Sequence, residues 1–326
     1  MPRRFLWALA IAILVSGGIL VLMLRQLDAE TWQSAFLRGD VSLIVRAGFF
    51  SLALLLFRSL RFTLLGRHVP FLTALTGTAI HTFIVRIMPM RLGEISLPVL
   101  FRTQSGEAPE HTVVSIALVR LVDLTVILAT GIIAIPLAFG TLTMERFGMG
   151  AVALIVLVAA VATFHRWVLA LVSVGVRVIA RLLPKQLPRV RRIEDKIVQA
   201  VAFNVALQGR RKLSFWLATA LVSVFQVLSL STLIRAYGVE LGVPQMVVGV
   251  SIAMLFGGVP LMTIGNFGTH ETGWTLGFMW VGVKSQDAIV SGIASGILTL
   301  GFALCFALPA AIYFFVTRQP SPQEPA

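Results

Sequence analysis

Two short polar stretches, Arg86-Ile-Met-Pro-Met-Arg-Leu-Gly-Glu94 and Gly265-Asn-Phe-Gly-Thr-His-Glu271, interrupt long apolar segments of the chain. Each stretch places glycine close to a carboxylate where the surrounding composition predicts hydrocarbon. Ionisable side chains are costly at membrane depth and are usually functional there. Backbone interrupted by Gly or Pro is tolerated at that depth only inside protein or beside a wet cavity. The two breaks therefore indicate a polar pathway rather than ordinary packing.

The composition around the breaks is that of a membrane protein. The 326 residues are 57% hydrophobic and 13% charged, with mean hydropathy +0.92, whereas soluble domains carry about 25% charged residues. The net charge of +13 lies mainly at the ends of apolar segments and in one loop. This is the positive-inside pattern, and no nucleic-acid partner is expected. Cys305 is a single cysteine in an apolar run, so neither a disulfide framework nor a thiolate metal cluster is expected.

Apolar runs long enough to cross a bilayer, about 20 residues, recur along the chain. Full spans are expected near residues 5–24, 41–57, 112–139, 147–164, 213–235 and 288–317. The first span follows Arg3 and Arg4, and we interpret it as an uncleaved anchor with a cytoplasmic N-terminus. Arg58, Arg61 and Arg67 are interpreted as the cytoplasmic end of the second span.

The two interrupted segments, 69–111 and 243–284, are interpreted as re-entrant helical hairpins of opposite orientation. Paired broken segments of this kind are typical of inverted-repeat transporters. We expect an all-α polytopic membrane protein with about six to nine transmembrane helices. A single domain would cover 1–318, followed by a disordered tail at 319–326. If both segments instead cross the bilayer fully, the helices number about eight or nine and the termini can change sides.

A basic amphipathic segment is expected on the cytoplasmic side at 184–212. Its apolar residues recur at helical spacing opposite four basic residues: Val190, Ile193, Ile197, Val201 and Val205 against Arg189, Arg191, Arg192 and Lys196. Such a helix lies well on an anionic membrane surface. It is either a solvated or docked face, or a site of regulatory lipid binding.

Glu94 and Glu271 are the leading candidates for function, because each lies where a half-helix would begin or end. A half-helix N-terminus offers free N–H groups that suit an anion, although the same carboxylates can simply cap helices. Guanidinium groups bind phosphate with two parallel hydrogen bonds, whereas an arginine at a helix end can also merely set topology. The predicted headgroup-binding residues are Arg86, Arg91, Glu94, Arg102, Asn266, Thr269 and Glu271.

Arg120 and Asp123 are three residues apart on one helix face, so they are expected to be able to pair. Such a pair is either a structural lock or part of a proton or substrate path. His270 adjoins Glu271 and is a candidate proton relay, whereas His81 is expected to form an interhelical hydrogen bond.

The sequence contains no Walker loop, no His-x-x-x-His pair and no Gly-x-Ser-x-Gly elbow. The protein is therefore expected not to be an enzyme, and no cofactor or bound metal is expected. Without an ATP-binding motif, any transport is expected to be facilitated or driven by an ion gradient.

The first break and its surroundings, Pro89-Met-Arg-Leu-Gly-Glu94, Arg102 and Val119-Arg-Leu-Val-Asp123, resemble the first signature of a known membrane family. That family is the flippase-like transmembrane region of lysyl-phosphatidylglycerol synthases. The second break resembles its second signature, although Pro260 and Thr263-Ile-Gly-Asn266 replace the usual Pro-Gly-Gly run. No soluble aminoacyl-transferase domain is present, so lysyl transfer is not expected of this chain.

The resemblance implies a bacterial or archaeal inner-membrane protein that moves a lipid between leaflets. The positions that match the family are Arg91, Glu94, Arg120, Asp123 and Glu271. The implied substrate is an anionic phospholipid or a polyprenyl-linked lipid, and the implied partners are membrane lipids. Two alternatives are a non-transporting subunit that presents lipid to a separate synthase or glycosyltransferase, and a lipid-modifying membrane enzyme.

Overall fold

The computed structural model describes residues 39–88, 92–140, 209–258 and 268–317. The described residues form helices and turns and contain no strand. In chain order the elements are α3 (Val41–Leu65), α4 (Phe71–Ile87), the 3₁₀ turn η1 (Leu92–Ile95), α5 (Ser96–Ser105), α6 (Pro109–Ala138), α9 (Gly209–Ala236), α10 (Val243–Gly258), α11 (Thr269–Trp280) and α12 (Ser285–Thr317). The spans predicted at 5–24 and 147–164, the tail at 319–326 and most of the segment 184–212 lie outside the described residues.

Within the described residues, four helices are long and apolar enough to cross a membrane: α3, α6, α9 and α12. Two of them expose a stripe of large apolar side chains at helical spacing. The stripes are Val41, Val45, Phe49, Leu52 and Leu56 on α3, and Leu213, Leu217, Leu221, Val224 and Leu228 on α9. Apolar faces of this size suit contact with lipid. The prediction of an all-α polytopic membrane protein is confirmed.

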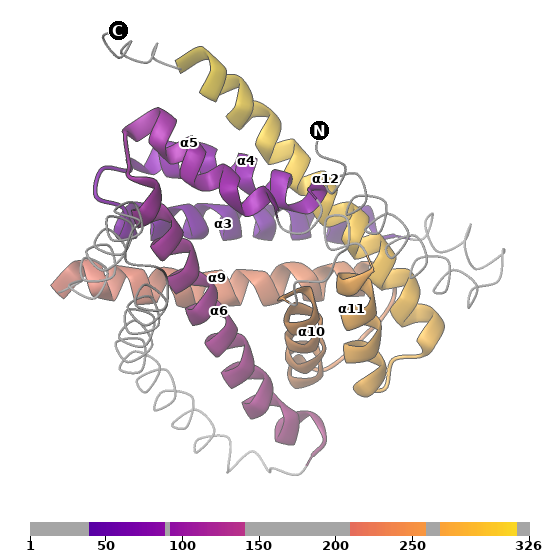
Figure 1. The fold of residues 1–326 in the computed structure, drawn as a ribbon. Helices are drawn as coiled ribbons and strands as arrows, with labels where there is room; N and C mark the ends of the chain where they lie inside the picture. Colours follow the sequence, from indigo (N-terminus) through magenta and orange to yellow (C-terminus); the bar gives the residue numbers. More distant parts are fainter. Residues whose placement is uncertain (1–38, 89–91, 141–208, 259–267, 318–326) are drawn as a thin grey trace, which may run out of the picture.

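Helices α3 and α9 form an antiparallel pair at the centre of the described fold (Figure 1). At one end, Arg211 near the start of α9 donates to the carbonyl oxygens of Leu64 and Gly66, at 2.6 and 2.7 Å. At the other end, the amide of Asp40 donates to the carbonyl oxygen of Ala236 at 2.9 Å. The pair therefore supplies a common axis against which the positions of the other helices can be described.

Asp40 also caps the start of α3. Its carboxylate accepts from the amides of Ser42 and Leu43, at 2.8 and 3.3 Å. Hydrogen bonding, first from the Ser42 side chain and then from the backbone, lowers the pKa of Asp40 below its usual value. The charged carboxylate is therefore favoured at the positive end of the helix.

The first interrupted segment folds as an antiparallel hairpin in which η1 and α5 run back along α4. The contact is close: a Cβ on Gly93 would lie 2.7 Å from Val85 Cα, and a Cβ on Gly77 would lie 2.6 Å from the Phe101 ring. At the open end, Glu107 accepts hydrogen bonds from the amides of Arg67 and His68, at 3.2 and 2.9 Å. This contact closes the base of the hairpin at the C-terminal end of α3.

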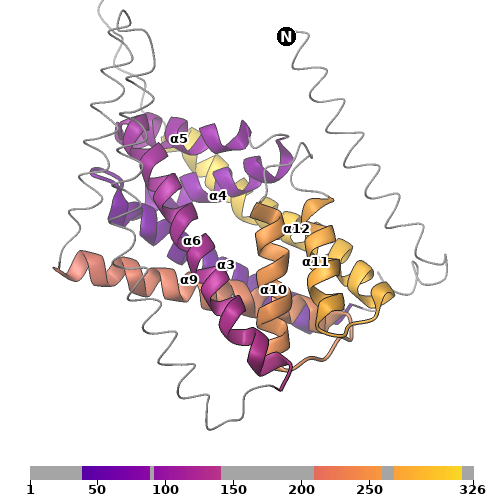
Figure 2. The same ribbon diagram turned by 60° about the horizontal axis from the view of Figure 1, so that its bottom comes forward.

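The second interrupted segment folds as another antiparallel hairpin, formed by α10 and α11. A Cβ on Gly277 would lie 2.7 Å from the carbonyl oxygen of Gly249, so small residues permit the backbones to approach. The base of this hairpin lies beside the C-terminal end of α6. There Gln245 donates to the carbonyl oxygen of Ala138 at 3.0 Å. Figure 2 shows the end of α6 beside the base of α10.

The two hairpins have their bases at opposite ends of the α3–α9 pair. The first follows the C-terminus of α3, where Arg211 binds, and the second follows the C-terminus of α9, where Asp40 binds. The opposite orientation predicted for the two interrupted segments agrees with these contacts. Each hairpin also packs into its own apolar cluster, around Phe101 in the first and around Trp274 and Phe278 in the second.

One predicted helix end is wrong. The second span was expected to end near Phe57, with Arg58 and Arg61 in the cytoplasm, but α3 continues to Leu65. Both arginines therefore lie inside the helix, and Arg61 is only 1% exposed. The reason is that each arginine donates to a side chain of another helix, Arg58 to Gln226 and Arg61 to Asp123. These hydrogen bonds replace water around the guanidinium charges inside the protein.

Candidate functional site

Glu94 lies in η1, just after the first break, and forms an ion pair with Arg120 of α6. His81 of α4 approaches the second carboxylate oxygen, with Nε2 at 3.9 Å. The other ring nitrogen of His81 shares a hydrogen bond with Ser96 Oγ at 2.9 Å, and Ser96 donates to the Gly93 carbonyl at 2.6 Å. The predicted interhelical role of His81 fits this contact between α4 and α5. The first break is thus linked to α6 by the ion pair of Glu94 and to α4 by the hydrogen bond between Ser96 and His81.

Asp123, one turn beyond Arg120 on α6, pairs with a different partner. Both terminal nitrogens of Arg61 donate to the Asp123 carboxylate, with Nη2 to Oδ2 at 3.1 Å. Arg120 and Asp123, which their spacing allows to pair with each other, therefore each pair with a different residue. Two arginine–carboxylate pairs between different elements take the place of a pair within one helix. Arg61 is buried, and its two terminal nitrogens gain a carboxylate partner that faces them in the interior.

Glu271 is the third residue of α11, immediately after the second break. It is 2% exposed, and its Oε2 accepts a hydrogen bond from the Gly268 amide at 2.7 Å. The carboxylate therefore caps the N-terminus of α11, the role weighed against a functional one from the sequence. Its Oε1 points at α12, where a Cβ on Gly296 would lie only 2.2 Å away.

This close approach predicts that Gly296→Ala displaces the Glu271 carboxylate. We expect the free energy of unfolding to fall by about 1–3 kcal/mol, the usual cost of overpacking. The matched control is Gly301→Ala on the same helix, where no heavy atom lies within 4 Å of the added methyl group. Unfolding of both variants in detergent measures the difference, and equal stability of the two would contradict the predicted clash.

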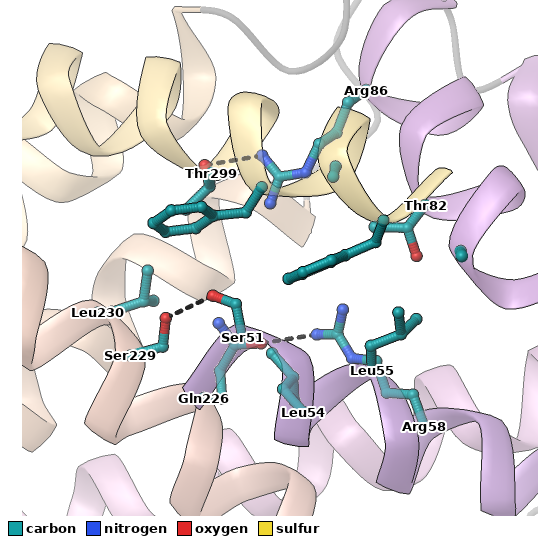
Figure 3. Close-up of a pocket in the computed structure, with 14 residues that line it drawn as sticks. Ser51, Leu54, Leu55, Arg58, Thr82, Arg86, Gln226, Ser229, Leu230 and Thr299 are labelled. Atoms are coloured by element: carbon teal, nitrogen blue, oxygen red, sulfur yellow. Dashed lines mark hydrogen bonds between the residues drawn. The ribbon is translucent and has the colours of Figure 1, made fainter. Parts of the chain in front are cut away.

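Two further arginines, Arg58 of α3 and Arg86 of α4, reach into a pocket between α3, α4, α9 and α12. Arg58 Nη2 donates to Gln226 Oε1 at 2.6 Å, and Arg86 Nη1 donates to Thr299 Oγ1 at 3.0 Å. Figure 3 shows the two guanidinium groups extending into the pocket from different walls.

The charges of the two breaks meet at α12, and Arg86 also lines the pocket. Arg86 from the first hairpin binds Thr299, and Glu271 from the second lies against Gly296, one turn earlier on the same helix. The charges of Arg86 and Glu271 are close enough to interact, and Arg58 lies within electrostatic range of Asp123 and of three other arginines. These three are Arg61, Arg86 and Arg120. The fold thus gathers four arginines that would repel one another without nearby anions.

The other predicted site residues lie at different places. Arg102 is on an exposed face of α5, so the structure does not bring it to the pocket. Thr269 is 3% exposed at the start of α11. The His270 ring lies 5.8 Å from that of Trp274, on the same short helix as Glu271. Arg91 and Asn266 lie outside the described residues.

Several polar residues of this site were not identified from the sequence. The wall of the pocket includes hydroxyl and amide side chains from four helices, namely Ser51, Thr82, Gln226, Ser229 and Thr299. Arg58 and Arg61 were predicted to mark the end of the second span, although the apolar residues that follow them, through Leu65, could have shown that the helix continues. No group of three or more His, Cys, Asp or Glu side chains suited to a metal occurs within the four described ranges.

Comparison with known proteins identifies the family. No curated protein and no solved structure matches the chain significantly. The sequence model of the family described as "Lysylphosphatidylglycerol synthase TM region" matches residues 7–307, which is most of the chain and includes both breaks and every helix of the pocket. The resemblance predicted from the motifs is confirmed, and this multi-pass membrane chain belongs to the lysylphosphatidylglycerol synthase TM region family.

Proposed function

We propose that this protein is a lipid translocator, which moves an anionic phospholipid or polyprenyl-linked lipid between the leaflets of the bacterial inner membrane. The observation that carries the proposal is that the two opposed hairpins place Arg86 and Glu271 against α12 one turn apart, and that Arg86 also lines the charged pocket. Membership of a family of membrane domains linked to lipid synthesis supports it. Transport would proceed without ATP hydrolysis and without a covalent step.

The hairpins are proposed to be re-entrant, with their tips near the middle of the bilayer. Their short helices support this, because the 17 residues of α4 and the 16 of α10 are fewer than a full span usually needs. Helix ends and broken backbone at that depth are stable where they line a polar cavity. The lipid headgroup would pass through the pocket while its chains extend out of it, toward the apolar stripes of α3 and α9.

The three carboxylates have different proposed roles. Asp123 and Glu94 neutralise Arg61 and Arg120, so these pairs keep the cluster together when no lipid is bound. Glu271 forms no ion pair within 4.0 Å among the described residues, so it is the carboxylate best placed to exchange a proton or to release Arg86. His270, beside it, is the proposed proton relay.

Leaflet-resolved translocation in proteoliposomes tests this proposal. Fluorescent phosphatidylglycerol and a fluorescent polyprenyl phosphate would be followed by quenching from one side only. We expect Glu94→Gln and Glu271→Gln to lower the rate about tenfold each, since each loses a charge-assisted contact of about 1.5 kcal/mol. The matched control is Glu240→Gln, an exposed carboxylate between α9 and α10.

Two outcomes would overturn different parts of the proposal. Equal rates for wild type and both glutamine variants would remove Glu94 and Glu271 from the site. No translocation of either lipid by wild-type protein would instead favour a subunit that presents lipid to a synthase or glycosyltransferase. Chemical change of the lipid by the purified protein would favour a membrane enzyme.

A further inference from the structure

The lining of the pocket between α3, α4, α9 and α12 combines polar and apolar side chains. The polar ones include Arg58 and Arg86, together with a hydrogen-bonded pair of serines, Ser51 and Ser229, whose oxygens lie 2.8 Å apart. The apolar ones include Phe302 and Phe306 of α12. A ligand that fills the pocket therefore needs a polar group and a hydrocarbon part.

The positive charge of Arg58 and Arg86 is not balanced by direct pairing with carboxylates. Within the described residues, the carboxylates of Asp123 and Glu94 pair with Arg61 and Arg120, which do not line this pocket. Arg58 and Arg86 are held by neutral oxygens, those of Gln226 and Thr299. No described carboxylate oxygen lies within 4.0 Å of either guanidinium group, although Glu271 acts on Arg86 from farther away.

Both arginine residues also keep part of their surface accessible. Arg58 and Arg86 are of intermediate exposure, in contrast to Arg61, which is 1% exposed and whose terminal nitrogens are engaged by Asp123. Each has further N–H donors, because a guanidinium group carries five and the structure gives Arg58 and Arg86 one side-chain bond each within the described residues. Two arginines with free donors form a site for an oxyanion of high charge.

Building on the translocation proposal, we propose that Arg58 and Arg86 together bind the phosphomonoester group of a lipid. A phosphomonoester carries a charge of about −1.5 to −2 at neutral pH and has three acceptor oxygens, whereas a phosphodiester carries a single charge. Two guanidinium groups without directly paired carboxylates match the monoester. Phe302 and Phe306 of α12 account for the preference for a lipid over free phosphate, because their rings offer contact to a hydrocarbon chain.

Direct binding measurements with the full purified chain in detergent test this assignment. The probes are radiolabelled phosphatidic acid as a lipid phosphomonoester, phosphatidylglycerol as a phosphodiester, and inorganic phosphate as a competitor. We expect phosphatidic acid to bind about tenfold more tightly than phosphatidylglycerol, the difference expected for one added charge-assisted contact. Its binding should weaken below about pH 6, where the monoester loses its second charge.

Variants then identify the residues. Arg58→Gln and Arg86→Gln should each weaken binding of phosphatidic acid about tenfold, and the lysine variants, which keep the charge, should lose less. Arg235→Gln is the matched control, because Arg235 lies on an exposed face near the end of α9. Thermal unfolding of each variant confirms that it is folded before its binding is interpreted.

Each result decides a separate point. Equal affinity for the two lipids overturns the phosphomonoester assignment, and unchanged binding in both glutamine variants overturns the site. Inorganic phosphate that competes as strongly as phosphatidic acid overturns the lipid part. Translocation is measured independently, so a chain that binds phosphatidic acid through Arg58 and Arg86 but moves no lipid would refute the proposed function and leave this binding site in place.

Discussion

Asp123→Ala should lower the free energy of unfolding by about 3–5 kcal/mol, the cost of removing one partner from a buried ion pair. The structure gives the reason. Arg61 is 1% exposed, and its two terminal nitrogens both donate to the Asp123 carboxylate. Without Asp123 the guanidinium charge stays inside the protein, next to Arg58 and with no carboxylate facing it. Unfolding in detergent, followed by circular dichroism, measures the loss.

A double variant separates the charge effect from the loss of packing. Arg61→Met with Asp123→Leu removes both charges and keeps apolar volume, so it should recover most of the lost stability. Asp287→Ala is the matched control, because Asp287 is an exposed carboxylate in the first turn of α12. Its loss should cost less than about 1 kcal/mol. Similar losses from Asp123→Ala and Asp287→Ala would show that the Arg61 pair does not stabilise the fold.

The positions of the long helices could be predicted from hydropathy alone. The span expected at 112–139 is α6 at Pro109–Ala138, and the span expected at 213–235 is α9 at Gly209–Ala236. Both predictions hold because runs of about 20 apolar residues end at polar residues in these two helices. The two breaks were also found correctly, since Gly and charged residues within apolar sequence are rare enough to stand out.

The pairing of charges could not be predicted in this way. Arg61 and Asp123 are 62 residues apart, and Arg120 and Glu94 are 26 apart, so helical spacing says nothing about either pair. The rule that arginines mark the cytoplasmic ends of spans placed Arg58 and Arg61 at the end of the second helix. It failed because these arginines face the protein interior, where a carboxylate or an amide oxygen replaces water.

Gly93→Ala should have the second large effect, because it forces the first hairpin apart. A methyl group on Gly93 would lie 2.7 Å from Val85 Cα and 2.8 Å from Val85 N, both of them backbone atoms that cannot turn away. The turn η1 must then move off α4, at a cost of about 3 kcal/mol, the upper part of the range for overpacking. Since Glu94 is the next residue, its pair with Arg120 and its approach to His81 are lost together.

A double-mutant cycle shows whether Gly93 acts through Glu94. If the methyl group impairs translocation by displacing the carboxylate, then Gly93→Ala combined with Glu94→Gln should be no slower than the slower single variant. Additive losses would instead mean that Gly93 supports transport by another route. Gly301→Ala, in open space on α12, controls for the added methyl group and should leave the rate unchanged. The glycine beside the carboxylate then has a physical explanation: it lets the backbones of η1 and α4 approach closely enough to hold Glu94 against Arg120.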